Sequence, residues 1–418
     1  MKLKSFVLLL LLLVAVQPAS SADWLQFRGP GGLGISAEKN LPTKWSDTEN
    51  ILWRKPLPGA GGSSPILLGN RLFLTCYSGY GMKAGKGNMK ELKRHLLCLD
   101  RRNGDQIWRR DFDPVLPEHK YQGEGAYHGY SSTTPITDGK RLYVFMGKSG
   151  VYCFDLDGKD IWHQLVGSGT NRWGCGCSPV LYKDMVIINA SVESGSMIAL
   201  SKKTGKEIWR SKGIHSSWNT PLLYRVGGGM ELAVSIQSNL IGLNPDTGKE
   251  LWRADGVHRY VCPSVVAHAG IVYCIGGGHT SLAVRGGGSG TVTKSHGVWR
   301  EKKGSNVVSP IYHKGHLYWA TDHGGVFYCQ NAKTGKTIYA KRMSPATGII
   351  YGSPVLADGK IYYLSQGNGT YVLPAEPKFK LLSHNVIKSD KSRTNSSIAV
   401  SNKQLFLRTD KFIYCIGK

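Results

Sequence analysis

Twelve polar and aromatic side chains fall in connecting segments that recur along the chain, and together they have the chemistry of a binding site. They are Tyr130, Arg172, Trp173, His215, Trp218, Asn219, His258, Arg259, Tyr260, Asn306, Tyr351 and Arg393. Aromatic rings stack on flat groups, whereas Arg, His and Asn side chains donate hydrogen bonds. This combination predicts a site for a planar anion, an acidic peptide or a sugar.

The sequence assigns no catalytic residue and no metal ligand. Glu193 and Asp322 are the clearest acids in these segments. They lie three repeat units apart, too far for the ~5–9.5 Å carboxylate pair of a glycosidase. The chain contains no Gly-x-Ser-x-Gly elbow and no His-Glu-x-x-His motif. We therefore expect a site that binds rather than one that hydrolyses.

A repeat of about 44 residues positions these segments. Each unit begins with Ser-Pro or Thr-Pro, continues through three short apolar strands, and ends with Thr-Gly-Lys and a strand containing Ile-Trp-Arg. The anchors are Ser64-Pro65, Thr134-Pro135, Ser178-Pro179, Thr220-Pro221, Ser309-Pro310 and Ser353-Pro354, with Cys262-Pro263 and Ser396-Ser397 as degenerate copies. Eight units of four short strands are typical of a β-propeller.

The last unit ends before its fourth strand, and the missing strand stands near the N-terminus. Ile51-Leu52-Trp53-Arg54 has the fourth-strand pattern and precedes the first Ser-Pro. Residues 51–57 should therefore complete the last blade and close the ring, which removes the open sheet edge. The prediction is an all-β, eight-bladed propeller of four-stranded antiparallel blades, one domain over residues 23–418, although 418 residues suggest two or three domains.

The Trp of each fourth strand should fill the space between neighbouring blades. One third-strand position should hold a small buried residue, because Cys98, Cys153, Cys329 and Cys415 alternate there with Ala199 and Gly242. Equivalent positions on different blades lie beyond the ~7 Å limit for a disulfide. We expect no structural disulfide among the nine cysteines.

Alternating strand direction places the connections between units on one face, together with the loops between second and third strands. Two long insertions, residues 77–95 and 111–131, fall on that face and should stand together as a wall. The opposite face consists of short Lys-bearing turns, and we expect no comparable concavity there. A central depression on the first face should therefore be lined by seven of the binding residues, namely Tyr130, Trp173, His215, Trp218, His258, Arg259 and Tyr260.

Residues 1–22 have the pattern of a signal peptide. Lys2 and Lys4 precede an apolar run over residues 6–16, and Ser20, Ser21 and Ala22 supply small residues before a cut after Ala22. The run spans about 17 Å, short of a ~30 Å membrane core. We expect a periplasmic or secreted monomer with no membrane span.

Lys and Arg outnumber Asp and Glu by 53 to 28, for a net charge of +25. Export argues against nucleic acid as the partner of this positive chain. The candidate partners are therefore an exported protein or an anionic cell-surface polymer. Binding of such a polymer should weaken as the salt concentration rises.

The units, such as Thr204-Gly205-Lys206-Glu207-Ile208-Trp209-Arg210, resemble the repeats of PQQ-like (pyrroloquinoline-quinone-type) eight-bladed propellers. That superfamily includes BamB-like propellers of outer-membrane protein assembly and quinoprotein alcohol dehydrogenases. Residues 24–30, Trp-Leu-Gln-Phe-Arg-Gly-Pro, followed by residues 50–54, Asn-Ile-Leu-Trp-Arg, resemble a widespread group of exported propellers. The resemblance covers residues 23–418 and is specific for fold rather than for activity.

Three functions follow as expectations from this resemblance and from the charge. The first is a non-catalytic binding or scaffold module for a protein or a cell-surface polymer, with no cofactor. The second is a PQQ- and calcium-dependent dehydrogenase, in which Trp173 or Trp218 stacks on the quinone and Arg172, Arg259 or Arg393 pairs its carboxylates. The third is a binder of anionic polysaccharide.

The sequence departs from the pattern expected for the second function. Many quinoproteins carry adjacent cysteines over the cofactor, whereas Gly176 separates Cys175 from Cys177 here. No motif supplies the acidic calcium ligands or the Asp base of that family.

Overall fold

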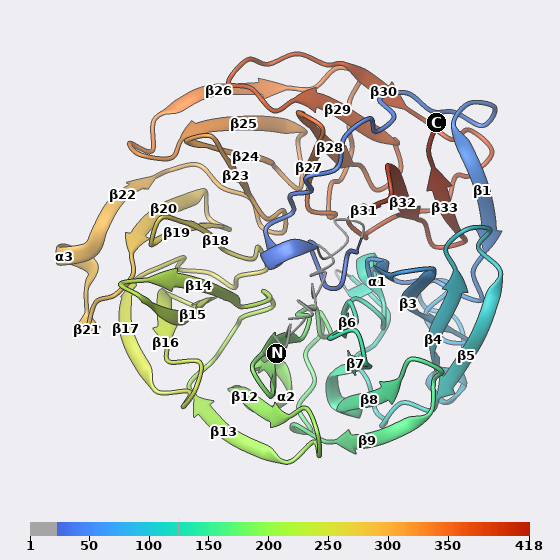
Figure 1. The fold of residues 1–418 in the computed structure, drawn as a ribbon, viewed down its shortest axis with the longest axis horizontal. Helices are drawn as coiled ribbons and strands as arrows, with labels where there is room; N and C mark the ends of the chain where they lie inside the picture. Colours follow the sequence, from blue (N-terminus) through green and yellow to red (C-terminus); the bar gives the residue numbers. More distant parts are fainter. Residues whose placement is uncertain (1–22, 124) are drawn as a thin grey trace, which may run out of the picture.

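Eight four-stranded antiparallel sheets stand around a central axis (Figure 1). The structure is a computed structural model and describes residues 23–123 and 125–418. The predicted signal peptide, residues 1–22, lies outside the described residues. Each sheet is one blade, with its first strand nearest the axis, so the predicted fold class is confirmed.

In blades 1 to 4, the strands lie side by side in the order in which they occur along the chain. Blade 1 contains β2 (Ile66–Leu68), β3 (Arg71–Ser78), β4 (Lys93–Asp100) and β5 (Gln106–Phe112). Blade 2 contains β6 (Ile136–Thr137), β7 (Arg141–Phe145), β8 (Val151–Asp155) and β9 (Asp160–Gln164). Blade 3 contains β10 (Val180–Tyr182), β11 (Met185–Ala190), β12 (Ser196–Ser201) and β13 (Glu207–Lys212). Blade 4 contains β14 (Leu222–Val226), β15 (Gly229–Ile236), β16 (Asn239–Leu243) and β17 (Glu250–Asp255).

The other four blades complete the ring. Blade 5 contains β18 (Val266–His268), β19 (Ile271–Gly276), β20 (Thr280–Arg285) and β22 (Gly297–Glu301). Blade 6 contains β23 (Ile311–His313), β24 (His316–Ala320), β25 (Val326–Asn331) and β26 (Thr337–Arg342). Blade 7 contains β27 (Val355–Ala357), β28 (Lys360–Leu364), β29 (Thr370–Pro374) and β30 (Ser383–Asn385). Blade 8 contains β31 (Ala399–Ser401), β32 (Gln404–Arg408), β33 (Phe412–Ile416) and β1 (Ile51–Pro56).

The remaining elements are short. β21 (Gly290–Thr291) lies in an insertion of blade 5 and pairs in parallel with β17, the outer strand of blade 4. The helices are η1 (Pro30–Gly32), η2 (Met89–Glu91), α1 (Gly125–His128), η3 (Gly147–Ser149), α2 (Ser191–Ser194) and α3 (Thr293–His296). In the part of the chain that the structure describes, no helix has the length and apolar character to cross a membrane.

The N-terminal strand closes the ring as predicted. β1 pairs antiparallel with β33, and Trp53 lies opposite Cys415. The last blade thus joins the two ends of the domain, and the pairing leaves β33 with a neighbour on each side.

Five of the six outer-strand Trp side chains also donate a hydrogen bond to the next blade, whereas Trp252 donates to Glu231 of its own blade. Trp108 Nε1 donates to the Leu156 carbonyl across 2.9 Å. Its ring lies against Gly158 (φ +83°), where an added Cβ would come within 2.9 Å of the ring. The glycine of the turn therefore lets the ring approach the backbone. Trp53, Trp162, Trp209 and Trp299 donate to turn carbonyls in the same way.

The third-strand position is small because it lies opposite this Trp. Cys98 pairs with Trp108, and Cys153 with Trp162. At Gly242, an added Cβ would lie 2.2 Å from the Trp252 ring. The small-residue prediction is confirmed, and burial raises the pKa of Cys98 to about 12.

The Ser-Pro anchors form a closed ring of hydrogen bonds around the axis. In each blade, the backbone N–H of the anchor Ser or Thr donates to the anchor hydroxyl of the next blade. The eight anchors are Ser64, Thr134, Ser178, Thr220, Ser264, Ser309, Ser353 and Ser397. In the two degenerate units, Ser264 and Ser397 occupy the anchor position. The prediction of Cys262-Pro263 as the anchor of blade 5 is wrong, because the hydroxyl that accepts the bond belongs to Ser264, the residue after the proline.

Residues 23–36 form a crossbar that passes over the middle of the ring (Figure 1). Trp24 bridges to Leu67 of blade 1, and Ile35 bridges to Leu356 of blade 7. Arg28 is buried and donates to the carbonyls of Leu33 and Pro310. Burial lowers the pKa of Arg28 to about 9. Thr137 of blade 2 donates its backbone N–H to the Leu25 carbonyl across 3.1 Å. The crossbar therefore contacts blades 1, 2, 6 and 7, of which blades 2 and 6 face each other across the ring.

Blade 7 lacks the outer-strand Trp, and Trp45 replaces it. In the register where other blades place Trp, Ser383 lies opposite Val372. Trp45 is buried, stacks on Tyr362 at 6.2 Å between ring centroids, and donates its backbone N–H to Asn385 across 3.2 Å. The segment before β1 thus fills the space that the lost side chain would occupy.

Candidate functional site

An axial cavity of about 420 Å³ lies inside the ring. Connectors from several blades line its wall with aromatic, amide and hydroxyl groups. The lining residues are Phe27, Gly62, Ser64, Tyr127, His128, Ser132, Trp173, Gly176, Trp218, Thr220, Tyr260, Cys262, Ser264, Asn306, Val307, Ser309, Asp322, His323, Tyr351, Ser353, Asn395 and Ser397.

Three rings form an aromatic wall, which we define as Trp173, Trp218 and Tyr260. The Trp173 and Trp218 centroids are 5.3 Å apart, and Trp173 meets Tyr260 edge-on at 3.9 Å. Trp218 Nε1 donates to the Gly174 carbonyl across 2.8 Å, which fixes that ring. All three side chains are half-buried. They offer adjoining apolar faces to a ligand.

An Asp322–His323–Asn306 group forms a polar part of the wall. Asp322 accepts from His323 Nδ1 at 2.8 Å, from the Asn306 amide side chain at 3.1 Å and from the Asn306 backbone at 2.9 Å. Burial alone would raise the pKa of Asp322, but these bonds hold it below its usual value. Asp322 is thus an anion whose hydrogen bonds orient His323 and Asn306.

His128 contributes a neutral ring to the wall. Burial lowers its pKa to about 4. Its Nδ1 lies 2.8 Å from the Ser132 hydroxyl. Since this imidazole carries no charge at neutral pH, it adds hydrogen-bonding capacity without adding positive charge.

Phe27 of the crossbar ends the axial cavity on the face of the short turns. It also lines a second cavity of about 250 Å³, between the crossbar and the inner strands of blades 3 and 4. The expectation of no comparable concavity on this face is wrong, because the crossbar builds one that the short turns alone would not.

Five of the twelve predicted residues line the axial cavity, namely Trp173, Trp218, Tyr260, Asn306 and Tyr351. The others lie outside the lining, namely Tyr130, Arg172, His215, Asn219, His258, Arg259 and Arg393. The predicted depression is therefore present, and three of the seven residues expected to line it do so, namely Trp173, Trp218 and Tyr260. Ligand binding by the twelve residues stays a prediction.

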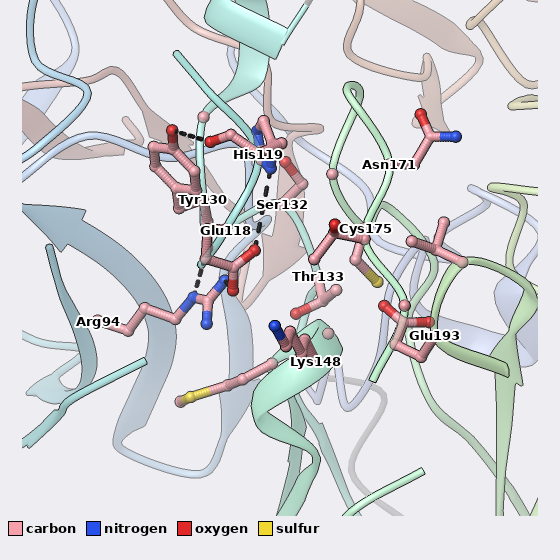
Figure 2. A pocket seen from close by; sticks show the side chains of 17 residues that line it. Arg94, Glu118, His119, Tyr130, Ser132, Thr133, Lys148, Asn171, Cys175 and Glu193 are labelled. Carbon is pink, nitrogen blue, oxygen red and sulfur yellow. Dashed lines mark hydrogen bonds and ion pairs between the residues drawn. The ribbon is translucent and has the colours of Figure 1, made fainter. Parts of the chain in front are cut away.

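Tyr130 lies in a smaller pocket beside the cavity, which Figure 2 shows. Its hydroxyl donates to the His119 carbonyl across 2.7 Å, and its ring meets Tyr77 edge-on. There Arg94 pairs with Glu118 at 2.6 Å. Burial lowers the pKa of His119 to about 3, so its ring is neutral beside Glu118.

Asn219 and Arg393 support loops. Asn219 is fully buried and donates to the Ser235 carbonyl across 2.6 Å. Arg393 donates to the Ala126 carbonyl and to the Tyr121 hydroxyl, each at 2.9 Å. Arg393 thus joins the connector that leads into blade 8 to the long connection between blades 1 and 2.

The remaining four predicted residues are exposed, namely Arg172, His215, His258 and Arg259. The Arg172 guanidinium lies 5.6 Å from the centroid of Trp173. Among the described residues that line the cavity, none is Lys or Arg. The lining therefore lacks the cations that a site for a planar anion was expected to contain.

The long insertions do pack together. The first is shorter than predicted, residues 79–92, because β3 and β4 pair as far as Ser78 and Lys93. Its Tyr80 hydroxyl accepts from the Tyr121 backbone, and the Glu118 backbone donates to Met89 Sδ. They form the predicted wall.

Four further lining residues are not among the twelve, namely Tyr127, His128, His323 and Asn395. Tyr127, His128 and Asn395 lie in the connectors that the sequence pattern indicates, whereas nothing in the sequence had pointed to His323. Two of these residues are next to a residue that the sequence analysis names: His323 follows Asp322, and Asn395 precedes Ser396. The sequence signal for the lining hydroxyls was stronger, since every anchor except Ser264 had been identified as the start of a first strand.

Comparison with known proteins agrees with this architecture. Residues 93–258 match the family model described as outer membrane protein assembly factor BamB. A sequence search of curated proteins gives no match. Among solved structures, BamB from Moraxella catarrhalis has a TM-score of 0.59 at 13% identity, covering 88% of this chain and 97% of that one.

Two dehydrogenases are similar to the same extent. Quinohemoprotein alcohol dehydrogenase from Comamonas testosteroni has a TM-score of 0.63 at 11% identity, covering 96% of this chain and 81% of that one. A europium-containing methanol dehydrogenase has a TM-score of 0.66 at 11% identity, covering 93% and 89%. The predicted resemblance to BamB-like and quinoprotein propellers is confirmed at the level of fold. An assembly factor and two dehydrogenases share that fold, so it does not by itself separate binding from catalysis.

Proposed function

We propose, from the fold that this chain shares with BamB and the quinoprotein dehydrogenases, that it is an exported, non-catalytic propeller. It binds a sugar unit of a cell-surface polymer in the axial cavity. The observation that carries this proposal is the aromatic wall of Trp173, Trp218 and Tyr260 in a cavity that also presents several hydroxyl and amide groups.

A sugar matches both halves of this lining. Its C–H face packs on aromatic rings, and its hydroxyls exchange hydrogen bonds with Ser, Thr and Asn side chains. A volume of about 420 Å³ falls within the usual ~300–1,000 Å³ range of ligand sites.

Binding without hydrolysis is supported by the carboxylates. Asp322 is the one carboxylate in the described lining, and both its oxygens accept hydrogen bonds. Glu193 lines the separate pocket of Figure 2. Hydrolysis of a glycosidic bond needs two carboxyl groups that flank the same bond.

The described lining does not fit PQQ. That quinone carries three carboxylates, and the described lining contains no Arg or Lys to balance three negative charges. The described residues also contain no group of three or more His, Cys, Asp and Glu side chains placed to hold a metal ion. The dehydrogenase alternative is therefore not adopted.

The test is sugar binding by variants of the aromatic wall. Trp173→Ala and Trp218→Ala together should lower the affinity for cell-wall oligosaccharides by roughly tenfold or more, because stacking contributes ~0.5–1.5 kcal/mol per ring beyond area burial. Calorimetric titration of the folded proteins measures the change.

Trp299→Phe is the control, since Trp299 lies on the outer strand of blade 5 and bonds Ala332 rather than the cavity. It should keep the wild-type affinity. Unchanged affinity in the double variant would contradict the proposal.

A second candidate function, a partner protein, is supported by the match of residues 93–258 to the BamB model. In that case a host lacking the protein should contain less outer-membrane protein. Restoration by the double Trp variant would show that this role does not use the axial cavity.

A further inference from the structure

The eight anchor hydroxyls all accept the same kind of hydrogen bond. Each takes a backbone N–H from the preceding blade at 2.9–3.2 Å. Seven of the eight residues are buried, and Thr220 is half-buried. We call this set the hydroxyl ring.

A hydroxyl group has one hydrogen to donate and can accept two bonds. In the described structure, none of the eight hydroxyls donates to a protein acceptor, and each is engaged through its oxygen alone. A buried donor without an acceptor is unfavourable, so these hydrogens need an acceptor from outside the protein.

Six of these hydroxyls reach the axial cavity, namely Ser64, Thr220, Ser264, Ser309, Ser353 and Ser397. Thr134 and Ser178 belong to the ring but not to the lining. Donors from six blades therefore line one and the same cavity. Each O–H is polarised by the N–H that it accepts, which strengthens its own donation.

We propose that the hydroxyl ring is an anion site that holds the carboxylate of an acidic sugar while the sugar ring packs on the aromatic wall. This inference rests on the proposed function and names its substrate class as sugars bearing a carboxylate. A carboxylate has two oxygens with about four acceptor positions and no hydrogen of its own, so it matches a set of donors that lacks acceptors.

The surrounding charges are compatible with an anion. The chain carries a net charge of +25, which attracts anionic polymers. Asp322 is the one acid in the described lining, and its charge is already stabilised by Ser305, Asn306 and His323. The exposed Arg172 and Arg259 lie on connectors that also supply the aromatic wall.

The experiment compares glucose with glucuronate on the full mature chain. Glucuronate should bind at least tenfold more tightly, and sodium sulfate should compete with it. Ser309→Ala and Ser353→Ala, which each remove one cavity donor, should each lower the affinity for glucuronate roughly tenfold and leave that for glucose within about twofold.

Ser178→Ala is the matched control. It removes the same inter-blade bond, from the Thr134 backbone across 3.0 Å, without removing a donor from the cavity. It should keep the preference for glucuronate. Thermal unfolding of all variants separates loss of fold from loss of binding.

The outcomes distinguish the inference from the function. Equal affinity for both sugars, or equal losses in Ser309→Ala and Ser178→Ala, would overturn the anion site and leave the sugar site standing. If no sugar binds, the proposed function fails, and titration with sulfate alone tests the anion site. Binding of sulfate to the wild type and to Ser178→Ala, but not to Ser309→Ala, would support the anion site. Absence of sulfate binding to the wild type would overturn it.

Discussion

Burial controls the charge of several side chains in the loops around the cavity. Glu193 is 5% exposed, and its Oε2 has no hydrogen-bond partner among the described residues. Burial raises the pKa of Glu193 to about 7. The acid is therefore protonated in the folded protein over a range in which the unfolded chain is ionised.

The stability of the protein should depend on this one acid. Because the folded state holds the proton more tightly, stability should fall as pH rises from about 4.5 through about 7. The loss amounts to about 3 kcal/mol. Glu193→Gln should remove this loss and be the more stable protein at pH 8, measured by denaturant unfolding across pH 5–8. Glu376→Gln, which changes an exposed acid, should follow the wild type. If the free energy of unfolding of Glu193→Gln fell with pH as steeply as that of the wild type, Glu193 would not be the source of the loss.

Residue type and connector position predicted part of the cavity. Trp173, Trp218 and Tyr260 lie where the connector pattern placed them. Asn219 and Tyr130 lie in the same kind of connector, but their side chains turn into the protein, where Ser235 and His119 offer carbonyls. The direction of a side chain depends on such partners in distant segments, which a single sequence does not contain.

At the scale of elements, Trp45 shows how the propeller tolerates an imperfect repeat. Blade 7 has Ser383 in the Trp register, and the aromatic contact with its second strand is restored from a segment outside the repeat. Ser383 in turn donates to the Thr43 carbonyl, and Asn385 donates to the same carbonyl across 2.9 Å. Ser383, which stands where other blades have Trp, therefore helps to hold residues 41–45 in the position that places Trp45 against blade 7.

Trp45→Ala should destabilise the protein by about 3–5 kcal/mol, as for other large buried aromatic residues. Differential scanning calorimetry measures the loss. Leu165→Ala, at a side chain that is 52% exposed, should change stability by less than about 0.5 kcal/mol. A comparably small effect of Trp45→Ala would show that blade 7 does not depend on this ring.

Repetition explains which elements were predictable. Strands, turns, the small third-strand position and the closing strand follow from the pattern that eight units share. The crossbar and β21 occur once each, so no comparison between units indicates them. The crossbar is nevertheless what limits the depth of the cavity, through Phe27.

At the scale of the whole molecule, three features hold the ring together. β1 joins the ends of the domain, the hydroxyl ring links each blade to the next, and the crossbar bonds to blades 2 and 6, which face each other across the ring. β1 and the hydroxyl ring connect neighbouring blades around the ring, whereas the crossbar passes over its middle (Figure 1). Their losses should therefore have different consequences.

Two truncations separate these contributions. Deleting residues 23–36 removes the crossbar and leaves β1, so we expect a folded monomer with a lower melting temperature. Deleting residues 23–57 also removes β1 and exposes the edge of β33, so we expect aggregation. Calorimetry and size-exclusion chromatography measure both outcomes. Wild-type stability of the longer truncation would contradict closure by β1.

The position of the seam has a consequence for how the protein is made. The hydrogen bond that completes the hydroxyl ring joins Ser397 to Ser64, residues 333 positions apart. A ribosome produces β1 near the beginning of its work and β33 near the end, so β1 waits without its partner while the intervening blades emerge. An unpaired strand with Trp53 exposed is a target for chaperones and a hazard for mispairing with other chains. Completion of the ring therefore depends on the last blade to be synthesised, and a stalled chain would display an open edge that quality control can recognise.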